Sequence, residues 1–163
     1  MAESNPDSGV RSTGISGLEA LLKAQGGRGL PPVERWNPPY CGDIGMRIRG
    51  DGVWLYQGSP IGRKPLVRLF STVLRRDADG RHYLVTPVEK VDVAVDDAPF
   101  LAVEMQVEGR GVDQVLTFRT NVDDVVRCGA DNALRFVVEA AAGGLKPYLL
   151  VRGRLEALVT RAV

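Results

Sequence analysis

The hydrophobic and polar positions of the chain repeat with a helical period in some segments and with a period of two in others. Residues 16–25 are typical of a first helix, because Ser16 and Glu19 have the spacing of a capping box and two glycines follow. A second helix, with Pro65 in its first turn, is predicted where apolar residues recur at i, i+3, i+4, i+7 and i+8. These apolar residues are Leu66, Leu69, Phe70, Val73 and Leu74.

Extended segments are predicted on both sides of this second helix. Residues 44–48 and 53–57 flank a Gly50–Gly52 turn, where glycine allows a positive φ, and therefore predict a hairpin. Beyond a turn at Asp77–Gly80, alternating apolar residues predict strands at 82–86, 88–95, 101–107, 114–120, 134–138 and 148–151. In the strand at 101–107, the residues expected to face inward are Leu101, Val103, Met105 and Val107.

Two helical features are expected toward the C-terminus. Asn121 is placed to cap a short helical turn that holds Asp123 and Asp124, acids that favour the start of a helix. Residues 154–163 repeat, 89 residues later, the apolar spacing of the helix around Leu66, and both helices follow an aromatic strand. Either a strand–helix unit is duplicated, or two unrelated amphipathic helices look alike.

The composition of successive segments suggests four parts. Residues 1–14 are small and polar and are expected to be a disordered leader. Residues 15–43 hold the first helix and a connector rich in proline and glycine, pinned by Trp36 and Tyr40. Residues 44–87 form an N-terminal subdomain and residues 88–163 a C-terminal β-rich subdomain with a terminal helix. The fold class expected is α+β, with two related small β-rich subdomains, each with a packed helix.

The overall composition excludes several classes of protein. The 21 basic and 20 acidic residues give a net charge of +1, so no double-stranded nucleic acid partner is expected. No signal sequence is apparent and no apolar run is long enough to span a bilayer, so we expect a cytoplasmic protein that binds no membrane. Cys41 and Cys128 are isolated and fit a reduced protein.

Charge is segregated along the chain despite this balance. Residues 44–76 contain seven basic residues and one acidic residue, whereas residues 88–125 contain nine acidic and three basic residues. Residues 126–163 are basic again, with six basic and three acidic residues. Either the segments neutralise each other across an interface, or one basic wall stays free to bind an anion.

The first candidate site is the segment Ser59–Pro65, which places Ser59, Arg63 and Lys64 at the start of the second helix. Unpaired backbone N–H groups at a helix start favour anions, and the two cations add charge-assisted bonds to a phosphate. The segment lacks the pattern of a P-loop. The alternative is a strand-to-helix connector whose basic residues are simply exposed.

The second candidate site is the segment Phe118–Asp124, where Arg119, Thr120 and Asn121 can face a ligand from the end of a strand. The alternative is a helix cap in which Arg119 pairs with Asp123 or Asp124. Arg152 at a later strand end adds a cation, and Tyr56 adds a ring that can stack on a base, although aromatic residues are by default part of the core.

Patterns that indicate catalysis are scarce. His82 is the single histidine of the chain and lies in a predicted strand with no serine or cysteine motif nearby, so a structural role is favoured over that of a general base. No carboxylates have the spacing of a known metal motif. We therefore expect no catalytic residues, no metal ligands and no cofactor.

Several runs of residues are distinctive when taken together: Trp36–Asp43, Trp54–Ile61, Arg63–Phe70, Tyr83–Lys90, Ala98–Phe100, Phe118–Asn121 and Leu155–Leu158. With these runs the sequence resembles a known bacterial family, domain of unknown function 1285. The resemblance implies a duplicated two-part fold whose second part is similar to a pleckstrin-homology-like barrel. It also implies a groove between the two parts that binds a nucleotide-like ligand in a signalling role, with no established activity and no catalytic residues to assign.

These observations give three hypotheses for function. The favoured one is a non-enzymatic regulatory module that binds an anionic, nucleotide-like ligand at the interface of its two subdomains. The alternative is a pleckstrin-homology-like protein-interaction module, in which the acidic segment, including Asp96 and Asp97, docks a basic protein partner. A phosphoesterase is the least favoured. The first hypothesis requires Arg63, Arg119 and Arg152 to converge on one cleft.

Overall fold

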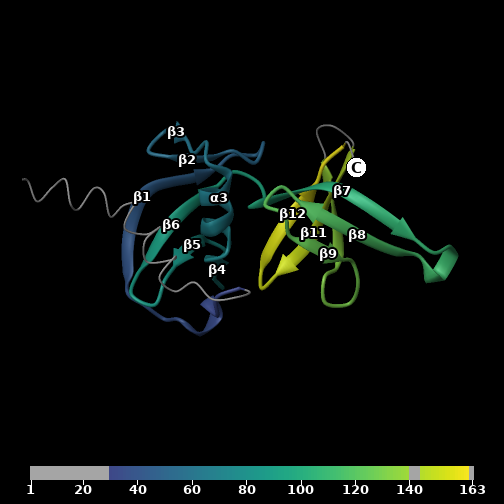
Figure 1. Ribbon diagram of the computed structural model, residues 1–163, viewed down its shortest axis with the longest axis horizontal. Helices are drawn as coiled ribbons and strands as arrows, with labels where there is room; N and C mark the ends of the chain where they lie inside the picture. Colours follow the sequence, from purple (N-terminus) through teal and green to yellow (C-terminus); the bar gives the residue numbers. More distant parts are fainter. Residues whose placement is uncertain (1–29, 140–143, 162–163) are drawn as a thin grey trace, which may run out of the picture.

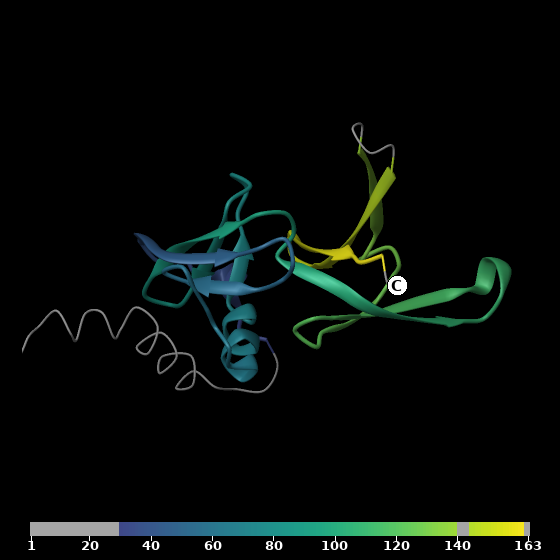
Figure 2. The ribbon, with the colours of Figure 1, turned by 90° about the horizontal axis from the view of Figure 1, so that it is seen from above.

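The protein consists of two β-rich halves joined between residues 95 and 100, as the computed structural model in Figures 1 and 2 shows. The structure describes residues 30–139 and 144–161. Each half holds one six-stranded sheet, in the orders β3-β2-β1-β6-β5-β4 and β10-β11-β12-β7-β8-β9. The N-terminal half carries one α-helix, and the described residues of the C-terminal half carry none.

The N-terminal half begins with a short 3-10 helix, η2 (Val33–Arg35), and continues with six strands and a helix. In chain order these are β1 (Tyr40–Ile48), β2 (Trp54–Tyr56), β3 (Ser59–Pro60), α3 (Lys64–Ser71), β4 (Leu74–Arg76), β5 (His82–Val85) and β6 (Lys90–Val95). The hairpin of β1 and β2 is confirmed, with Gly52 at a φ of 86° in its turn.

The C-terminal half also has six strands, with a second 3-10 helix at the tip of its first hairpin. The elements are β7 (Phe100–Glu108), η3 (Gly111–Asp113), β8 (Val115–Thr120), β9 (Val125–Arg127), β10 (Leu134–Glu139), β11 (Gly144–Arg152) and β12 (Leu155–Val159). The β7–β8 and β10–β11 hairpins extend away from the body of the molecule in different directions (Figure 2).

The two sheets share one topology. Counted from the start of each half, both follow the strand order 3-2-1-6-5-4. In both, the first and last strands are parallel neighbours at the centre of the sheet, β1 with β6 and β7 with β12, and all other pairs are antiparallel. β7 begins 60 residues after β1. The expected duplication is therefore present, but its unit is a six-stranded sheet and not a strand–helix pair repeated after 89 residues.

The helix predicted at 154–163 is wrong, and with it the expectation that each half carries a packed helix. Residues Leu155–Val159 form β12, which lies between β11 and β7. Leu155 and Ala157 are buried on one face, as the period of two requires. The apolar spacing of these residues also fits a helix, but their hydrogen bonds to β11 on one side and β7 on the other make them a strand.

Two further local predictions are corrected. α3 ends at Ser71 and not at Leu74, because Leu74 begins the edge strand β4, which pairs with β5. The turn after β8 is not helical: Asp123 has a φ of 68°, and the chain reverses directly into β9. Asn121 therefore caps no helix.

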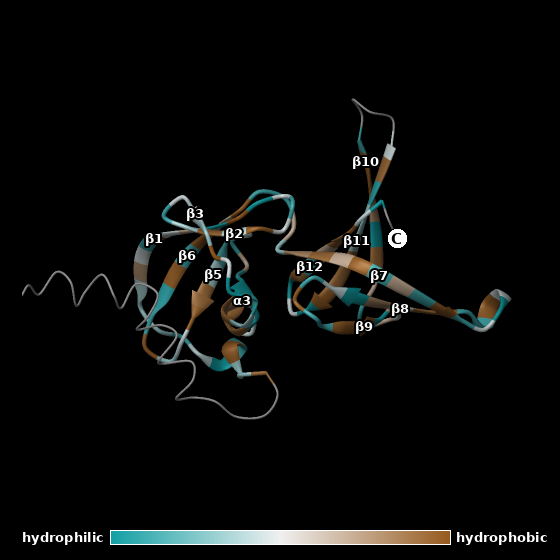
Figure 3. Cartoon of the chain, turned by 45° about the horizontal axis from the view of Figure 1, so that its top comes forward, coloured by the Kyte–Doolittle hydropathy of each residue, from teal (hydrophilic) through white to brown (hydrophobic). Residues whose placement is uncertain are grey.

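The predicted inward face of β7 is also wrong. Phe100 and Ala102 are fully buried, whereas Met105 and Val107 are 43% and 45% exposed. β12 pairs only with residues 100–102 of β7, so in the described part of the chain the outer half of β7 has β8 as its single neighbouring strand. In Figure 3 this hairpin and the β10–β11 hairpin carry hydrophobic colour well away from the core.

The buried apolar residues of both halves form one continuous core. Trp54 and Phe70 stack with their ring centroids 6.4 Å apart, and both belong to the same cluster as Phe100 and Leu149 of the second half. Each half on its own would bury a small core, so the shared cluster stabilises both together. The prediction that aromatic residues belong to the core is thus confirmed for Trp54, and Trp36 and Tyr56 are partly buried against the same cluster.

The connector before β1 is held by the first sheet, as expected. The buried Arg75 donates to the carbonyls of Val33 and Trp36 at 2.7 and 2.8 Å, and it pairs with Asp77 at 2.6 Å. Tyr40 packs edge-on against the Tyr83 ring. The extended segment is thereby fixed by a buried charge that has its own carboxylate partner.

Two sequence predictions concern residues that the structure does not describe, and the predicted boundary between the two subdomains differs from the boundary between the two sheets. The leader at 1–14 and the helix at 16–25 lie outside the described residues. β6 pairs with β1 and β5, so residues 90–95 belong to the first sheet, although the predicted boundary at 87 assigned them to the C-terminal subdomain.

Candidate functional site at the seam between the halves

The two halves meet along a seam with a hollow on each of two sides. On the helix side, a groove of about 350 Å³ separates α3 from the turn between β8 and β9. Its lining residues include Arg68, Ser71 and Thr72 from α3 and its C-terminal end, and Asp123 and Asp124 from the turn. Four of the eight candidate residues from the sequence lie next to this groove, at or beside the turn: Arg119, Thr120, Asn121 and Arg152.

The 120–124 turn owes its shape to buried polar groups. The Oγ1 of the fully buried Thr120 accepts the backbone N–H groups of Val122 and Asp124 at 3.3 and 3.1 Å. Asn121 Oδ1 accepts the N–H of Leu101 at 3.0 Å. A Cβ at Gly52 of the first half would lie 2.8 Å from Asn121 Nδ2, so the turn also touches the β1–β2 hairpin. Thr120 and Asn121 thus build the seam.

A chain of ion pairs crosses the helix side. Arg119 pairs with Glu104 and with Asp123, each at 2.8 Å, and Arg68 of α3 reaches Asp123 at 3.4 Å. The bond to Glu104 is the main reason why the pKa of Arg119 is raised, and it holds the pKa of Glu104 below its usual value. The pairing of Arg119 with Asp123, the alternative to ligand binding, is present, although in a tight turn and not in a helix cap.

Arg152 connects three elements of the seam. Its Nη1 pairs with Asp124 at 2.6 Å, and its Nη2 donates to the carbonyl of Ser71 at the end of α3, also at 2.6 Å. The guanidinium carbon lies 5.3 Å from the centroid of the Phe100 ring. Arg152 therefore holds the C-terminal end of α3 against the second sheet.

The other predicted site residues lie away from this network. Tyr56 and Ser59 are on β2 and β3, Arg63 precedes the first residue of α3, and Lys64 is exposed. Arg63 and Ser71 are eight residues apart along the helix, about 12 Å at the rise of an α-helix. The structure thus gathers Arg119, Thr120, Asn121 and Arg152 at the turn and places Arg63 at the far end of the helix.

The segregated charges neutralise one another to a large extent. The acidic segment 88–125 pairs with both basic segments, through Arg47–Asp96 and Arg68–Asp123 on one side and Lys146–Asp97 and Arg152–Asp124 on the other.

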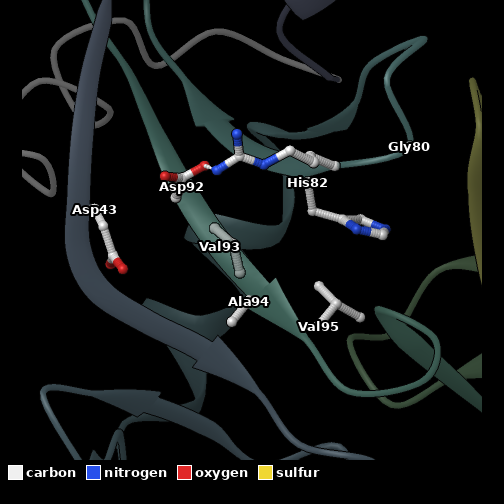
Figure 4. Close-up of a pocket in the computed structure, with 8 residues that line it drawn as sticks. Asp43, Gly80, His82, Asp92, Val93, Ala94 and Val95 are labelled. Atoms are coloured by element: carbon white, nitrogen blue, oxygen red, sulfur yellow. Dashed lines mark hydrogen bonds and ion pairs between the residues drawn. The ribbon is translucent and has the colours of Figure 1, made fainter.

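On the histidine side, the seam contains a cavity of about 140 Å³ lined by charged residues from both halves. Arg76 and His82 come from the N-terminal half, and Arg135, Tyr148 and Glu156 come from the C-terminal half. His82 also lines a second hollow of about 400 Å³, formed by Asp43, Gly80, Arg81 and residues 92–95 (Figure 4). In Figure 4 the imidazole points away from Asp43.

His82 is neutral at pH 7. Burial, with a smaller effect of the neighbouring Arg76 charge, lowers its pKa to about 4. Its Nε2 is buried and has no hydrogen-bond partner among the described residues. A buried polar atom without a partner costs stability, so such atoms often mark a place where a ligand or water binds.

Arg76 is the cation beside this histidine. Its Nε donates to the carbonyl of Gly80 at 3.2 Å, and it forms no ion pair with any residue in 30–139 or 144–161. The acids of the cavity are already paired. Arg135 holds Glu156 with two bonds of 2.6 and 2.8 Å, and Asp97 accepts bonds from Lys146 and Tyr148, both at 2.6 Å.

Burial opposes ionisation of Asp97, but the bonds from Lys146 and Tyr148 outweigh it and hold the pKa of Asp97 below its usual value. All charges of the cavity except that of Arg76 therefore have partners. In the sequence, Arg76 is one of seven basic residues in 44–76, and only the single histidine six residues later distinguishes it.

Other kinds of site find no support in the described part of the chain. No three His, Cys, Asp or Glu side chains gather there as a metal ion requires. Cys41 is exposed and Cys128 half-buried, and both are free thiols. No described helix is long and apolar enough to cross a membrane.

Comparison with known proteins agrees with the division into two halves. Residues 31–98 match the model of the N-terminal domain of DUF1285, a domain of unknown function, and residues 99–163 match its C-terminal domain. No match was found among curated proteins.

Two crystal structures of DUF1285 family proteins are similar. That from Silicibacter pomeroyi DSS-3 is 52% identical, with a TM-score of 0.81 over 88% of this chain and 78% of the other. That from Shewanella baltica OS155 is 25% identical, with a TM-score of 0.55 over 73% of this chain and 86% of the other. Because both family models together cover residues 31–163, the chain belongs to the DUF1285 family.

Proposed function

We propose that this protein is a non-enzymatic regulatory module that binds a small anionic, nucleotide-like ligand at the seam between its halves. The observation that carries the proposal is the pair formed by Arg76 and His82 in the histidine-side cavity. Arg76 is a cation without a carboxylate partner among the described residues, and His82 has a buried nitrogen without a hydrogen bond. A phosphate group would satisfy both.

The dimensions of the two hollows fit such a ligand. The cavity of about 140 Å³ is too small for a whole nucleotide but holds a phosphate group. The adjoining hollow of about 400 Å³ shares His82 and has room for the remainder, with the exposed carboxylate of Asp43 as an acceptor for hydroxyl or amino groups. A ligand in this position contacts both halves, so its binding would stiffen the seam, which suits a signalling role.

Calorimetry and thermal shift against a panel of nucleotides, cyclic dinucleotides and inorganic phosphate test this proposal. We expect at least one phosphate compound to bind and raise Tm, and Arg76→Met to weaken its binding by about 10- to 100-fold, the loss of one charge-assisted contact. Arg127→Met is the matched control, because Arg127 is an exposed arginine on β9 outside both hollows.

The result also distinguishes the two sides of the seam. If Arg63→Ala abolishes binding and Arg76→Met does not, the ligand binds at the start of α3, as the sequence alone suggested. If no phosphate compound binds, or if Arg76→Met and Arg127→Met behave alike with Arg63→Ala also unchanged, the proposal is wrong. A pleckstrin-homology-like character of the C-terminal half and a cytoplasmic location remain predictions.

A protein-interaction module is the second candidate, but through a different surface from the acidic one expected. Asp96 is paired with Arg47, and Asp97 with Lys146 and Tyr148, so neither carboxylate lacks a partner. What favours an interaction role is the apolar surface of the β10–β11 hairpin, where Phe136 is 61% and Val138 68% exposed.

A further inference from the structure

The β10–β11 hairpin presents an apolar face that nothing in the described chain covers. The register pairs Phe136 with Pro147 and Val138 with Leu145, so these four side chains lie on one face of the ribbon. Phe136, Val138 and Leu145 are 61%, 68% and 63% exposed. Figure 3 shows the hydrophobic colour of β10 rising away from the rest of the molecule.

β10 is also an open edge of the second sheet, and it is the longest of the four edge strands. It has six residues, whereas β3, β4 and β9 have two, three and three. Proteins that stay monomeric protect long apolar edges with prolines, bulges or inward charges. β10, with the sequence LRFVVE, has neither a proline nor a bulge, and its two charged residues, Arg135 and Glu139, lie on the face opposite Phe136 and Val138.

The backbone groups that face this open edge can be identified. The N–H of Leu150 donates to the carbonyl of Ala133 at 3.0 Å, which makes positions 133 and 150 a hydrogen-bonded pair. Because such pairs alternate in an antiparallel ladder, residues 135, 137 and 139 also bond to β11. The N–H and C=O groups of Leu134, Phe136 and Val138 then point to the open edge.

The sequence of β10 is complementary to itself in one antiparallel register. When Val137 lies opposite Val137 of a second copy, Phe136 lies opposite Val138, and the outward backbone groups of these residues bond to each other. In the same register Arg135 lies opposite Glu139, so opposite charges meet twice. A shift by two residues loses both charge pairs and shortens the ladder.

The charged residues can make these contacts without giving up their present partners. Arg135 binds Glu156 through Nε and Nη2, which leaves Nη1 for a second carboxylate. The Glu139 side chain is 39% exposed and lies 3.7 Å from Lys146, a long contact. A guanidinium between two carboxylates is a common arrangement at interfaces.

We propose that a second copy of this chain pairs with β10, antiparallel and centred on Val137, so that the two C-terminal sheets form one continuous sheet. The apolar faces of the two ribbons then lie side by side, and Phe136 of each copy packs against Val138 of the other. The apolar contact of Phe136 with Val138 lies on the face of the ribbon opposite the ligand cavity, whose lining includes Arg135, Val137 and Tyr148. The Phe136→Lys test therefore leaves the lining of that cavity unchanged, whereas Arg135→Glu alters it.

Sedimentation velocity and light scattering of the full chain, over a range from about 1 μM to about 1 mM, test the dimer. We expect a species of twice the mass of one chain that increases with concentration. Phe136→Lys should weaken the dimer by at least tenfold. Val112→Lys is the matched control, because Val112 is fully exposed on the other hairpin, and it should leave the dimer unchanged.

The register is tested by mixing two charge variants. Arg135→Glu alone places Glu opposite Glu139, and Glu139→Arg alone places Arg opposite Arg135, so each variant should be monomeric. In a mixture both facing pairs become opposite in charge, and a heterodimer of wild-type strength is expected. Thermal melts of each variant confirm that it is folded.

Each other outcome overturns the proposal. A wild-type protein that is monomeric up to 1 mM, or a dimer that Phe136→Lys leaves unchanged, rules out this interface. Failure of the mixture to dimerise rules out the antiparallel register centred on Val137. Slow amide exchange at Phe136 and Val138 in a monomeric protein would show that the chain's own residues cover the edge instead.

Discussion

Replacement of Arg152 by methionine should uncouple the two halves of the molecule. The variant keeps the apolar stem of the side chain but loses the bonds to Asp124 and to the Ser71 carbonyl, each 2.6 Å long, and the contact with the Phe100 ring. The side chains of Arg152 and Asp124 are 21% and 29% exposed, so both groups are largely withdrawn from water. Asp124 would be left without its cation.

The magnitude follows from these contacts. A charged hydrogen bond to a largely buried group contributes about 1.5–3 kcal/mol, and a cation–π contact about 0.5–1 kcal/mol. Residual solvent access at Asp124 reduces the cost of its unpaired charge. We therefore expect Arg152→Met to lower the free energy of unfolding by about 2–4 kcal/mol, and Tm by roughly 5–15 °C for a chain of this size.

Urea unfolding followed by tryptophan fluorescence and far-UV circular dichroism measures this loss. Trp54 reports on the core of the first half, and circular dichroism reports on both sheets. Arg127→Met, an exposed arginine with no ion pair among the described residues, should change the free energy by less than about 0.5 kcal/mol. A loss below about 1 kcal/mol for Arg152→Met, or two variants of equal stability, would refute the role of Arg152 at the seam.

Three further changes test other parts of the structure. His82 has a pKa of about 4 in the folded chain and near 6.5 in the unfolded chain, so between these pH values only the unfolded chain gains a proton. The free energy of unfolding should therefore fall by about 1–2 kcal/mol from pH 6.5 to pH 4. Urea titrations at several pH values measure this slope, and His82→Gln should remove the part that His82 contributes. Gly52→Ala should cost about 1–2 kcal/mol, since Gly52 has a φ of 86° and Asn121 lies against it, whereas Gly50→Ala has open space and should be neutral in thermal melts. Phe70→Ala should cost about 3–5 kcal/mol in the same assay, because Phe70 is fully buried.

Most strands were predictable from the sequence because their residues alternate locally. Residues 155–159 were not, since Leu155 and Leu158 satisfy a helical period while Leu155, Ala157 and Val159 satisfy a period of two. The contact that decides between them is the parallel pairing of β12 with β7, which begins 55 residues earlier in the chain. A local pattern holds no information about such a partner.

The prediction of which residues of β7 face inward was wrong for a related reason. Met105 and Val107 alternate correctly with Glu104 and Gln106, but alternation only separates two faces and does not say whether either face is covered. The pairing of β12 with β7 ends at Ala102, and beyond it the described residues give β7 only β8 as a neighbouring strand. Coverage depends on the length of the neighbouring strands, which is a property of the whole sheet.

The candidate site was predictable only in its general location. A position between two halves followed from the resemblance to the family, and Arg119, Thr120, Asn121 and Arg152 do lie at the seam. The partners of Arg119 and Arg152, such as Glu104 and Ser71, come from distant parts of the chain. These contacts could therefore not be predicted from the sequence. Arg76 and His82 stand out for the opposite reason: among the described residues Arg76 has a backbone hydrogen bond but no carboxylate partner, and the Nε2 of His82 has no hydrogen bond.

The duplicated topology suggests why the second half exposes more large apolar side chains than the described residues of the first half. Between its third and fourth strands the first half has α3, which adds the buried residues Leu66 and Phe70 to the core. At the equivalent place the second half has only residues 128–133, and the strand that follows, β10, leaves Phe136 and Val138 exposed. A fold that repeats a sheet but not its covering helix leaves this surface apolar, and pairing of the edge strand β10 with a second copy buries part of it where Phe136 of each copy packs beside Val138 of the other.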